Sequence, residues 1–92
     1  MKDAKLTLAP WVLKRFEPQL GSYYFFNAKS KKMWTGDHTI GSIISVLDGT
    51  LTCNQVLDIL IANNRSISKD ELQKFLFAIF EMLIKEDYLV KS

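Results

Sequence analysis

The chain has 92 residues, 48% of them hydrophobic, and a net charge of +2 at pH 7. That length supports one modest core, so a second domain is not expected, and so small a charge gives no indication of nucleic-acid binding. The one cysteine, Cys53, excludes an internal disulfide, and no apolar run is long enough to span a bilayer, so we expect a soluble, cytoplasmic protein without membrane contact.

The first third of the chain predicts strands. Residues 1–10 are expected to be loosely ordered, with a single domain over 11–90. The segment Trp11–Phe16 is rich in aromatic and branched residues, which is typical of an edge strand. Four consecutive aromatic residues in Ser22–Ala28 favour a central strand covered on both faces. After a polar turn, Lys32–Thr35 completes a three-stranded antiparallel meander.

From residue 36 onwards the apolar spacing becomes helical. Asp37 is placed to cap a first helix, and Gly49 stands where a left-handed C-cap would end it. The apolar side of this helix comprises Ile40, Ile43, Ile44 and Leu47. Thr52 and Gln55 form a capping-box pattern that begins a second helix, and the Asn63–Asn64 pair is expected to end it.

A third helix is predicted over Lys69–Lys85, because Ser68 and Glu71 repeat the capping pattern. A short extended tail, Tyr88–Val90, follows it. Three strands followed by three helices predict an α+β fold of the winged-helix type.

The third helix carries a wider apolar arc than a small core requires. Its main stripe is expected to pack inward and consists of Leu72, Phe75, Leu76, Ile79, Met82 and Leu83. Phe77, Phe80 and Ile84 lie beside that stripe. Either the sheet or the tail covers this flank, or the flank lines a hydrophobic groove beside the neighbouring sheet edge.

The third strand, with Met33 and Trp34, lies at an edge of the predicted meander. An edge strand has unpaired backbone donors and acceptors, to which an extended peptide can add as a further strand. Such a peptide would place alternate side chains against the helix flank. The alternative for Trp34 is simple core packing, under the first helix against Ile43 and Ile44.

Residues for catalysis are scarce. His38 is the only histidine, so the chain cannot assemble a catalytic triad or a histidine-rich metal site by itself. Cys53 follows a helix N-cap, which can lower a thiol pKa, but no histidine is near it in the sequence. The four glycines form no phosphate-binding pattern. We therefore expect no enzyme activity and no cofactor.

Two segments, LDGTLTCNQVLDIL and LFAIFEMLIKEDYLV, together with the order of elements, resemble the PqqD-like family of peptide-recognition elements. The resemblance runs from about Trp11 to Val90. It implies non-catalytic binding of the leader segment of a ribosomally made precursor peptide. The leader would add as a strand between the third strand and the third helix, for delivery to a separate modifying enzyme such as a radical S-adenosylmethionine enzyme, a cyclodehydratase or a leader peptidase.

Carried over by position, the resemblance assigns strand and helix contacts to the peptide. These are Lys32, Met33, Trp34 and Thr35 on the strand, and Gln73, Phe77 and Phe80 on the helix. The segment FNAKSKKMWTG departs from the family, because lysines replace its usual Pro-Glu-Gly hairpin tip. The chain is expected to be free-standing, as a monomer or a weak homodimer.

Charge separates the alternatives. Residues 1–46 carry seven Lys/Arg and three Asp/Glu, giving +4, whereas residues 47–92 carry five and seven, giving −2. The front half, with its lysine cluster at 29–32, would attract an acidic partner, although these lysines also suit a solvated turn.

The main rival function is a winged-helix DNA-binding regulator, but the third helix has as many acidic as basic residues. A self-pairing structural module is the third possibility.

Overall fold

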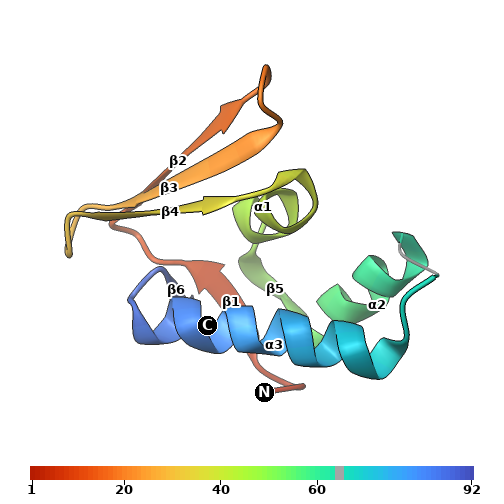
Figure 1. Cartoon of the computed structure of the whole chain (residues 1–92). Coiled ribbons are helices and arrows are strands. Elements are labelled where there is room, and N and C mark those ends of the chain that lie inside the picture. The colour runs from red at the N-terminus through yellow and green to blue at the C-terminus, as the bar shows by residue number, and fades with distance from the viewer. Residues whose placement is uncertain (64–65) are drawn as a thin grey trace.

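The computed structural model describes residues 1–63 and 66–92, and within these ranges the chain forms three helices and two three-stranded antiparallel sheets (Figure 1). In chain order the elements are β1 (Lys5–Leu8), β2 (Val12–Glu17), β3 (Ser22–Asn27), β4 (Lys32–Gly36), α1 (His38–Ser45), β5 (Asp48–Thr52), α2 (Cys53–Asn63), α3 (Lys69–Lys85) and β6 (Leu89–Lys91). The predicted α+β class, with a meander before the helices, is confirmed. None of the helices described is long and apolar enough to cross a membrane.

The predicted meander is the sheet β2-β3-β4, with β3 in the centre. Its register places Leu13, Phe26 and Met33 side by side on one face. The opposite face points to the core, where Phe25 is fully buried and its ring lies 5.4 Å from that of Trp34. The expectation that both faces of the central strand are covered is wrong, because the helices and the second sheet supply a core for only one.

The second sheet, β5-β1-β6, was not expected. The prediction that residues 1–10 are loosely ordered fails for Lys5–Leu8, which pair with β5 on one side and β6 on the other. Leu6 is 1% exposed and belongs to the core. The pairing partners are distant in sequence, as in the register of Leu6 with Lys91, so no local pattern marks this strand.

The first helix begins as predicted and ends early. The Asp37 carboxylate accepts a hydrogen bond from the backbone N–H of Ile40 at 2.8 Å. The helix ends at Ser45, with Val46 as its C-cap. Gly49 has a φ of +85°, as a left-handed position requires, but it lies within β5 and not at the helix end. The backbone after α1 therefore turns into a strand where a longer helix was expected.

The other two helices begin at their predicted caps. The Thr52 N–H donates to the Gln55 side chain at 2.8 Å, and the Gln55 N–H donates to the Thr52 hydroxyl at 3.2 Å. The Ser68 hydroxyl accepts from the Glu71 N–H at 3.2 Å. The third helix has the predicted bounds, whereas Asn64, part of the predicted end of α2, lies outside the described residues.

The core face of α3 differs from the predicted stripe. The buried residues of this helix are Leu72, Leu76, Phe80 and Leu83. Phe75 and Met82, which were expected to pack inward, are 53% and 38% exposed. The helix is thus rotated relative to the predicted core face, with Phe80 inside.

Cys53 is a buried residue at the start of α2. Its Sγ lies 3.6 Å from the Met1 sulfur, and its side chain is part of the hydrophobic core. Burial raises the pKa of the Cys53 thiol. The lowered thiol pKa that a helix N-terminus can produce is therefore not found here.

Because β1 is part of the core, replacing Leu6 should destabilise the whole domain. We expect Leu6→Ala to lower the free energy of unfolding by about 2–5 kcal/mol. The matched control is Leu13→Ala, whose side chain is 65% exposed and whose effect should stay within about 0.5 kcal/mol. Urea denaturation measures both variants, and equal unfolding free energies would show that β1 is not held in the core.

The raised thiol pKa predicts a loss of stability at alkaline pH. Above about pH 8.5 the thiol ionises in the unfolded chain while it stays protonated in the folded one, so unfolding becomes easier as pH rises. Comparison of wild type with Cys53→Ala from pH 7 to 9.5 isolates this contribution. A thiol reagent should also react slowly with the native chain and quickly in denaturant, and fast native labelling would contradict burial.

Candidate functional site

Strand β4 is one of the two edge strands of its sheet among the described residues, and β2 is the other. Strand β4 pairs with β3 on one side, and in Figure 1 it is the strand of this sheet drawn nearest to α3. The register runs from Asn27 opposite Lys32 to Tyr23 opposite Gly36 without a bulge. One side of β4 therefore has backbone groups available to a further strand.

The four predicted strand residues divide between the two faces of the sheet. Met33 is 60% exposed and, like Thr35, points to the outer face. Lys32 and Trp34 share the inner face. The Trp34 indole is half-buried, packs against the core, and lies against the ring of Phe25. Trp34 thus packs against the core with one part of its indole and leaves another part accessible.

The turn between β3 and β4 is tied to the end of α3. Asn27 is fully buried, and its Nδ2 donates to the backbone oxygens of Glu86 and Asp87 at 3.0 and 3.1 Å. Its Oδ1 accepts from the N–H groups of Lys29 and Ser30. Ion pairs join the side chains across the same junction, Lys29 to Asp87 at 3.9 Å and Lys32 to Glu86 at 4.0 Å.

This junction explains how the lysine-rich turn between β3 and β4 is stabilised. Lys31 adopts a φ of +64°, the left-handed conformation that a glycine would take more easily. The Asn27 side chain satisfies two turn N–H groups, which stabilises the turn from inside. Lys29 and Lys32, on either side of Lys31, form ion pairs with Asp87 and Glu86 after α3.

The predicted helix residues differ in accessibility. Gln73 and Phe77 are half-buried, and Phe77 packs against the core. Phe80 is fully buried, with its ring 6.3 Å from that of Phe77. Phe80 is therefore a core residue, and the prediction that it lines a surface groove does not agree with its position. Phe80 was assigned to the groove because the apolar arc of α3 is broad, and the arc alone does not indicate which of its residues face the core.

A hollow of about 400 Å³ begins where β4 ends. It lies between the start of α1 and the first half of α3, and its lining residues are Asp37, Thr39, Ile40, Leu60, Ile67, Glu71, Leu72 and Phe75. Its floor is apolar, and two carboxylates, of Asp37 and Glu71, line it. None of these residues was predicted as a site, because the exposure of Phe75 depends on how α3 packs and is not visible in the sequence.

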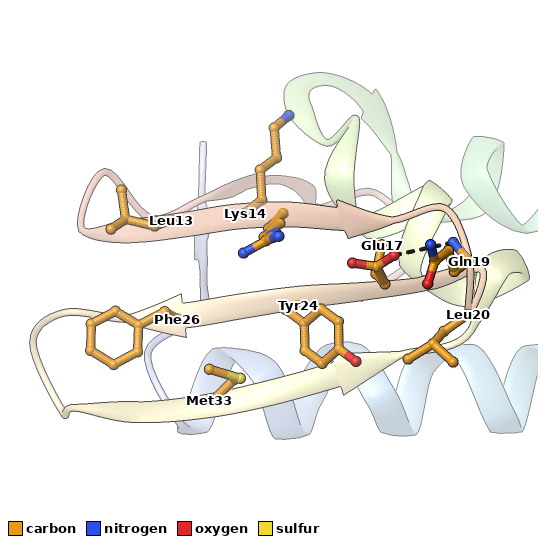
Figure 2. Close-up of a pocket in the computed structure, with 9 residues that line it drawn as sticks. Leu13, Lys14, Glu17, Gln19, Leu20, Tyr24, Phe26 and Met33 are labelled. Carbon is orange, nitrogen blue, oxygen red and sulfur yellow. Dashed lines mark hydrogen bonds between the residues drawn. The ribbon is translucent and has the colours of Figure 1, made fainter.

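A larger hollow, of about 670 Å³, lies on the outer face of the β2-β3-β4 sheet (Figure 2). Figure 2 shows Leu13, Phe26 and Met33 together at one end of this face, Tyr24 in the middle and Leu20 at the other end. These side chains come from all three strands and from the β2–β3 turn. Sequence reasoning assigned Met33 to the peptide-binding strand, expected Tyr24 and Phe26 to be covered on a central strand, and gave Leu13 and Leu20 no role in a site.

Comparison with known proteins shows the fold. No protein-family model matches the sequence, and no curated protein matches it. Among solved structures, the chain is similar to "TbiB1 in Complex with the TbiA(beta) Leader Peptide", with a TM-score of 0.77 and 13% sequence identity. The match covers 90% of this chain and 93% of that chain. The two chains therefore share one α+β architecture over nearly their whole lengths.

Proposed function

We propose that this chain binds the leader segment of a ribosomally made precursor peptide, without catalysis, and delivers it to a separate modifying enzyme. The observation that carries the proposal is the free edge of β4, which runs from Lys32, ion-paired with Glu86 at the end of α3, to Gly36, next to Asp37 of the apolar hollow. A solved protein with the same fold is in complex with a leader peptide, which supports leader-peptide binding by this chain.

The edge supplies most of the binding through main-chain hydrogen bonds. An extended peptide that pairs with Lys32–Thr35 continues the antiparallel sheet, and its alternate side chains point to the two faces of that sheet. On the inner face they approach Trp34 and then Phe77 and Gln73 of α3. Met33 and Thr35 contribute their backbone here, because their side chains point to the outer face.

The hollow at the end of β4 supplies selectivity. We assign it to one apolar side chain of the peptide, which would contact Phe75 and Ile67, both exposed in the unbound chain. The carboxylates of Asp37 and Glu71 favour a neighbouring basic residue in the peptide over an acidic one. At the other end of β4, the lysines of the β3–β4 turn favour acidic residues.

The rival function, DNA binding, would need a basic recognition helix. The outward positions of α3 mix Asp70, Glu81 and Lys85 with exposed apolar residues, so this helix lacks the phosphate and base contacts that duplex recognition uses. Peptide binding requires no such surface. We therefore rank the peptide function first.

Titration of the ¹⁵N-labelled chain with a synthetic leader segment of a candidate precursor peptide, chosen from the genes next to the one that encodes this chain, tests the proposal. We expect amide shifts at residues 32–35 and around the hollow, with a Kd near micromolar, about −8 kcal/mol. Amides on the free edge of β4 should also become protected from hydrogen exchange. Shifts confined to the β5-β1-β6 sheet, or tight salt-resistant binding of duplex DNA, would contradict it.

Phe75 separates binding from folding better than the other aromatic residues of α3. We expect Phe75→Ala to weaken peptide binding about tenfold while changing the unfolding free energy by less than about 1 kcal/mol, because half of its surface is already exposed. Calorimetric titration and thermal melts measure the two effects.

Two variants on the same helix serve as controls. Met82→Ala removes an exposed side chain outside the hollow and should leave the affinity unchanged. Phe80→Ala empties a core position and should cost about 3–5 kcal/mol of stability. If Phe75→Ala binds the peptide as wild type does, the hollow has no part in recognition.

A further inference from the structure

The outer face of the β2-β3-β4 sheet, defined by Leu13, Leu20, Tyr24, Phe26 and Met33, is more exposed than a face without a partner should be. Leu13 is 65% exposed, Leu20 70% and Met33 60%, and the two rings between them are half-buried. Figure 2 shows these side chains on one face of the three strands, and they line one hollow. Contiguous apolar patches of this kind mark interaction sites on small soluble domains.

Charge identifies the kind of partner. Arg15 lies on the outer face, opposite Tyr24 in the register, and Lys31 lies in the turn beside Met33. Neither has an ion-pair partner among residues 1–63 and 66–92, whereas Lys29 and Lys32 are paired with residues after α3. The carboxylate that lines this hollow is that of Glu17, which already accepts a hydrogen bond from the Gln19 N–H.

A second copy of this chain is a poor occupant of the face. The charged residues that line the face are Lys14, Arg15 and Glu17, so two copies packed through it would bring two surfaces of the same net positive charge together, and like charges at an interface oppose association. An apolar surface with an acidic rim complements the face instead. Interfaces between proteins have this form, with an apolar centre and a polar rim.

The position of the face relative to β4 links it to the bound peptide. A peptide strand added at the edge of β4 extends the sheet, so half of its side chains continue the outer face next to Met33 and Thr35. A protein seated on this face would touch the adaptor and the peptide together. Peptide binding and partner binding would then strengthen each other by the same factor.

From these observations we infer that the outer face of the β2-β3-β4 sheet is the docking surface for the modifying enzyme, through an apolar patch with an acidic rim on that enzyme. This inference rests on the proposed leader-binding function. Beyond that function, the inference names the surface that contacts the enzyme. It also explains why the chain with bound leader peptide should bind the enzyme more tightly than the chain without it.

The test uses a purified candidate modifying enzyme and a candidate precursor peptide, both chosen from the genes next to the one that encodes this chain. The double variant Leu13→Ser/Leu20→Ser removes two exposed side chains from the face and leaves the β4 edge intact. The matched control is Val46→Ser/Ile59→Ser, which removes two exposed side chains, 70% and 47% exposed, from the surface between α1 and α2. Surface-plasmon resonance measures enzyme binding with and without leader peptide, and calorimetry measures peptide binding alone.

We expect the face variant to bind the enzyme at least about tenfold more weakly than wild type, with unchanged peptide affinity, while the control binds both normally. Arg15→Glu should also weaken enzyme binding, and the wild-type complex should weaken as salt rises. Leader peptide should tighten the wild-type complex.

The results that contradict the proposed function differ from those that contradict the docking inference. If wild type binds no leader peptide, the proposed function is wrong. If wild type binds the peptide but not the enzyme, or the face variant binds the enzyme as wild type does, the docking inference is wrong. It is also wrong if sedimentation shows that wild type self-associates at micromolar concentration and that the face variant does not, because a second copy then covers the face.

Discussion

The buried side chain of Asn27 is the contact on which the placement of the β4 edge depends. Its amide group makes four hydrogen bonds, two to the backbone that follows α3 and two within the β3–β4 turn. A buried amide that loses its partners costs about 1–3 kcal/mol for each unsatisfied group. The hairpin therefore cannot move away from α3 without breaking several bonds together, and the strand edge stays at a fixed position beside the helix.

The surroundings of Asn27 add weaker contacts that act in the same direction. The Trp11 indole N–H donates to the Asp87 backbone oxygen at 2.8 Å, and the Lys29 ammonium lies 4.7 Å from the Trp11 ring centre. These exposed contacts are each worth about 1 kcal/mol or less. Together they join the start of β2, the hairpin turn and the end of α3, three segments that are far apart in the sequence.

Local signals predicted the elements that depend on local contacts. The caps at Asp37, Thr52 and Ser68 are hydrogen bonds between residues three apart, so their residue types are visible in the sequence. The strand β1 depends instead on partners more than 40 residues away, and nothing near Leu6 indicates them. The meander was predictable for the same reason as the caps, because its strands are joined by short turns.

The candidate site was predictable on the strand and not on the helix. An edge position follows from strand order, so Lys32–Thr35 could be chosen before the structure was known. The inward side of α3 depends on what packs against it, and the apolar residues of this helix cover too wide an arc to decide. As a result, Phe75, which was expected in the core, is exposed, and Phe80, which was expected in the groove, is buried. The outer sheet face was missed because four consecutive aromatic residues suggested burial on both sides.

The pairing of β1 with β6 has a practical consequence for handling the protein. The N–H of Ser92 donates to the backbone oxygen of Lys5 at 2.7 Å, so the first strand and the last residue lie side by side in the β5-β1-β6 sheet (Figure 1). A short flexible linker could join the two ends, and new ends could then be opened in the exposed β2–β3 turn. An affinity tag or a tether to a solid support can likewise be placed before Met1 or after Ser92, since the neighbouring strands β1 and β6 belong to the sheet that does not contain β4.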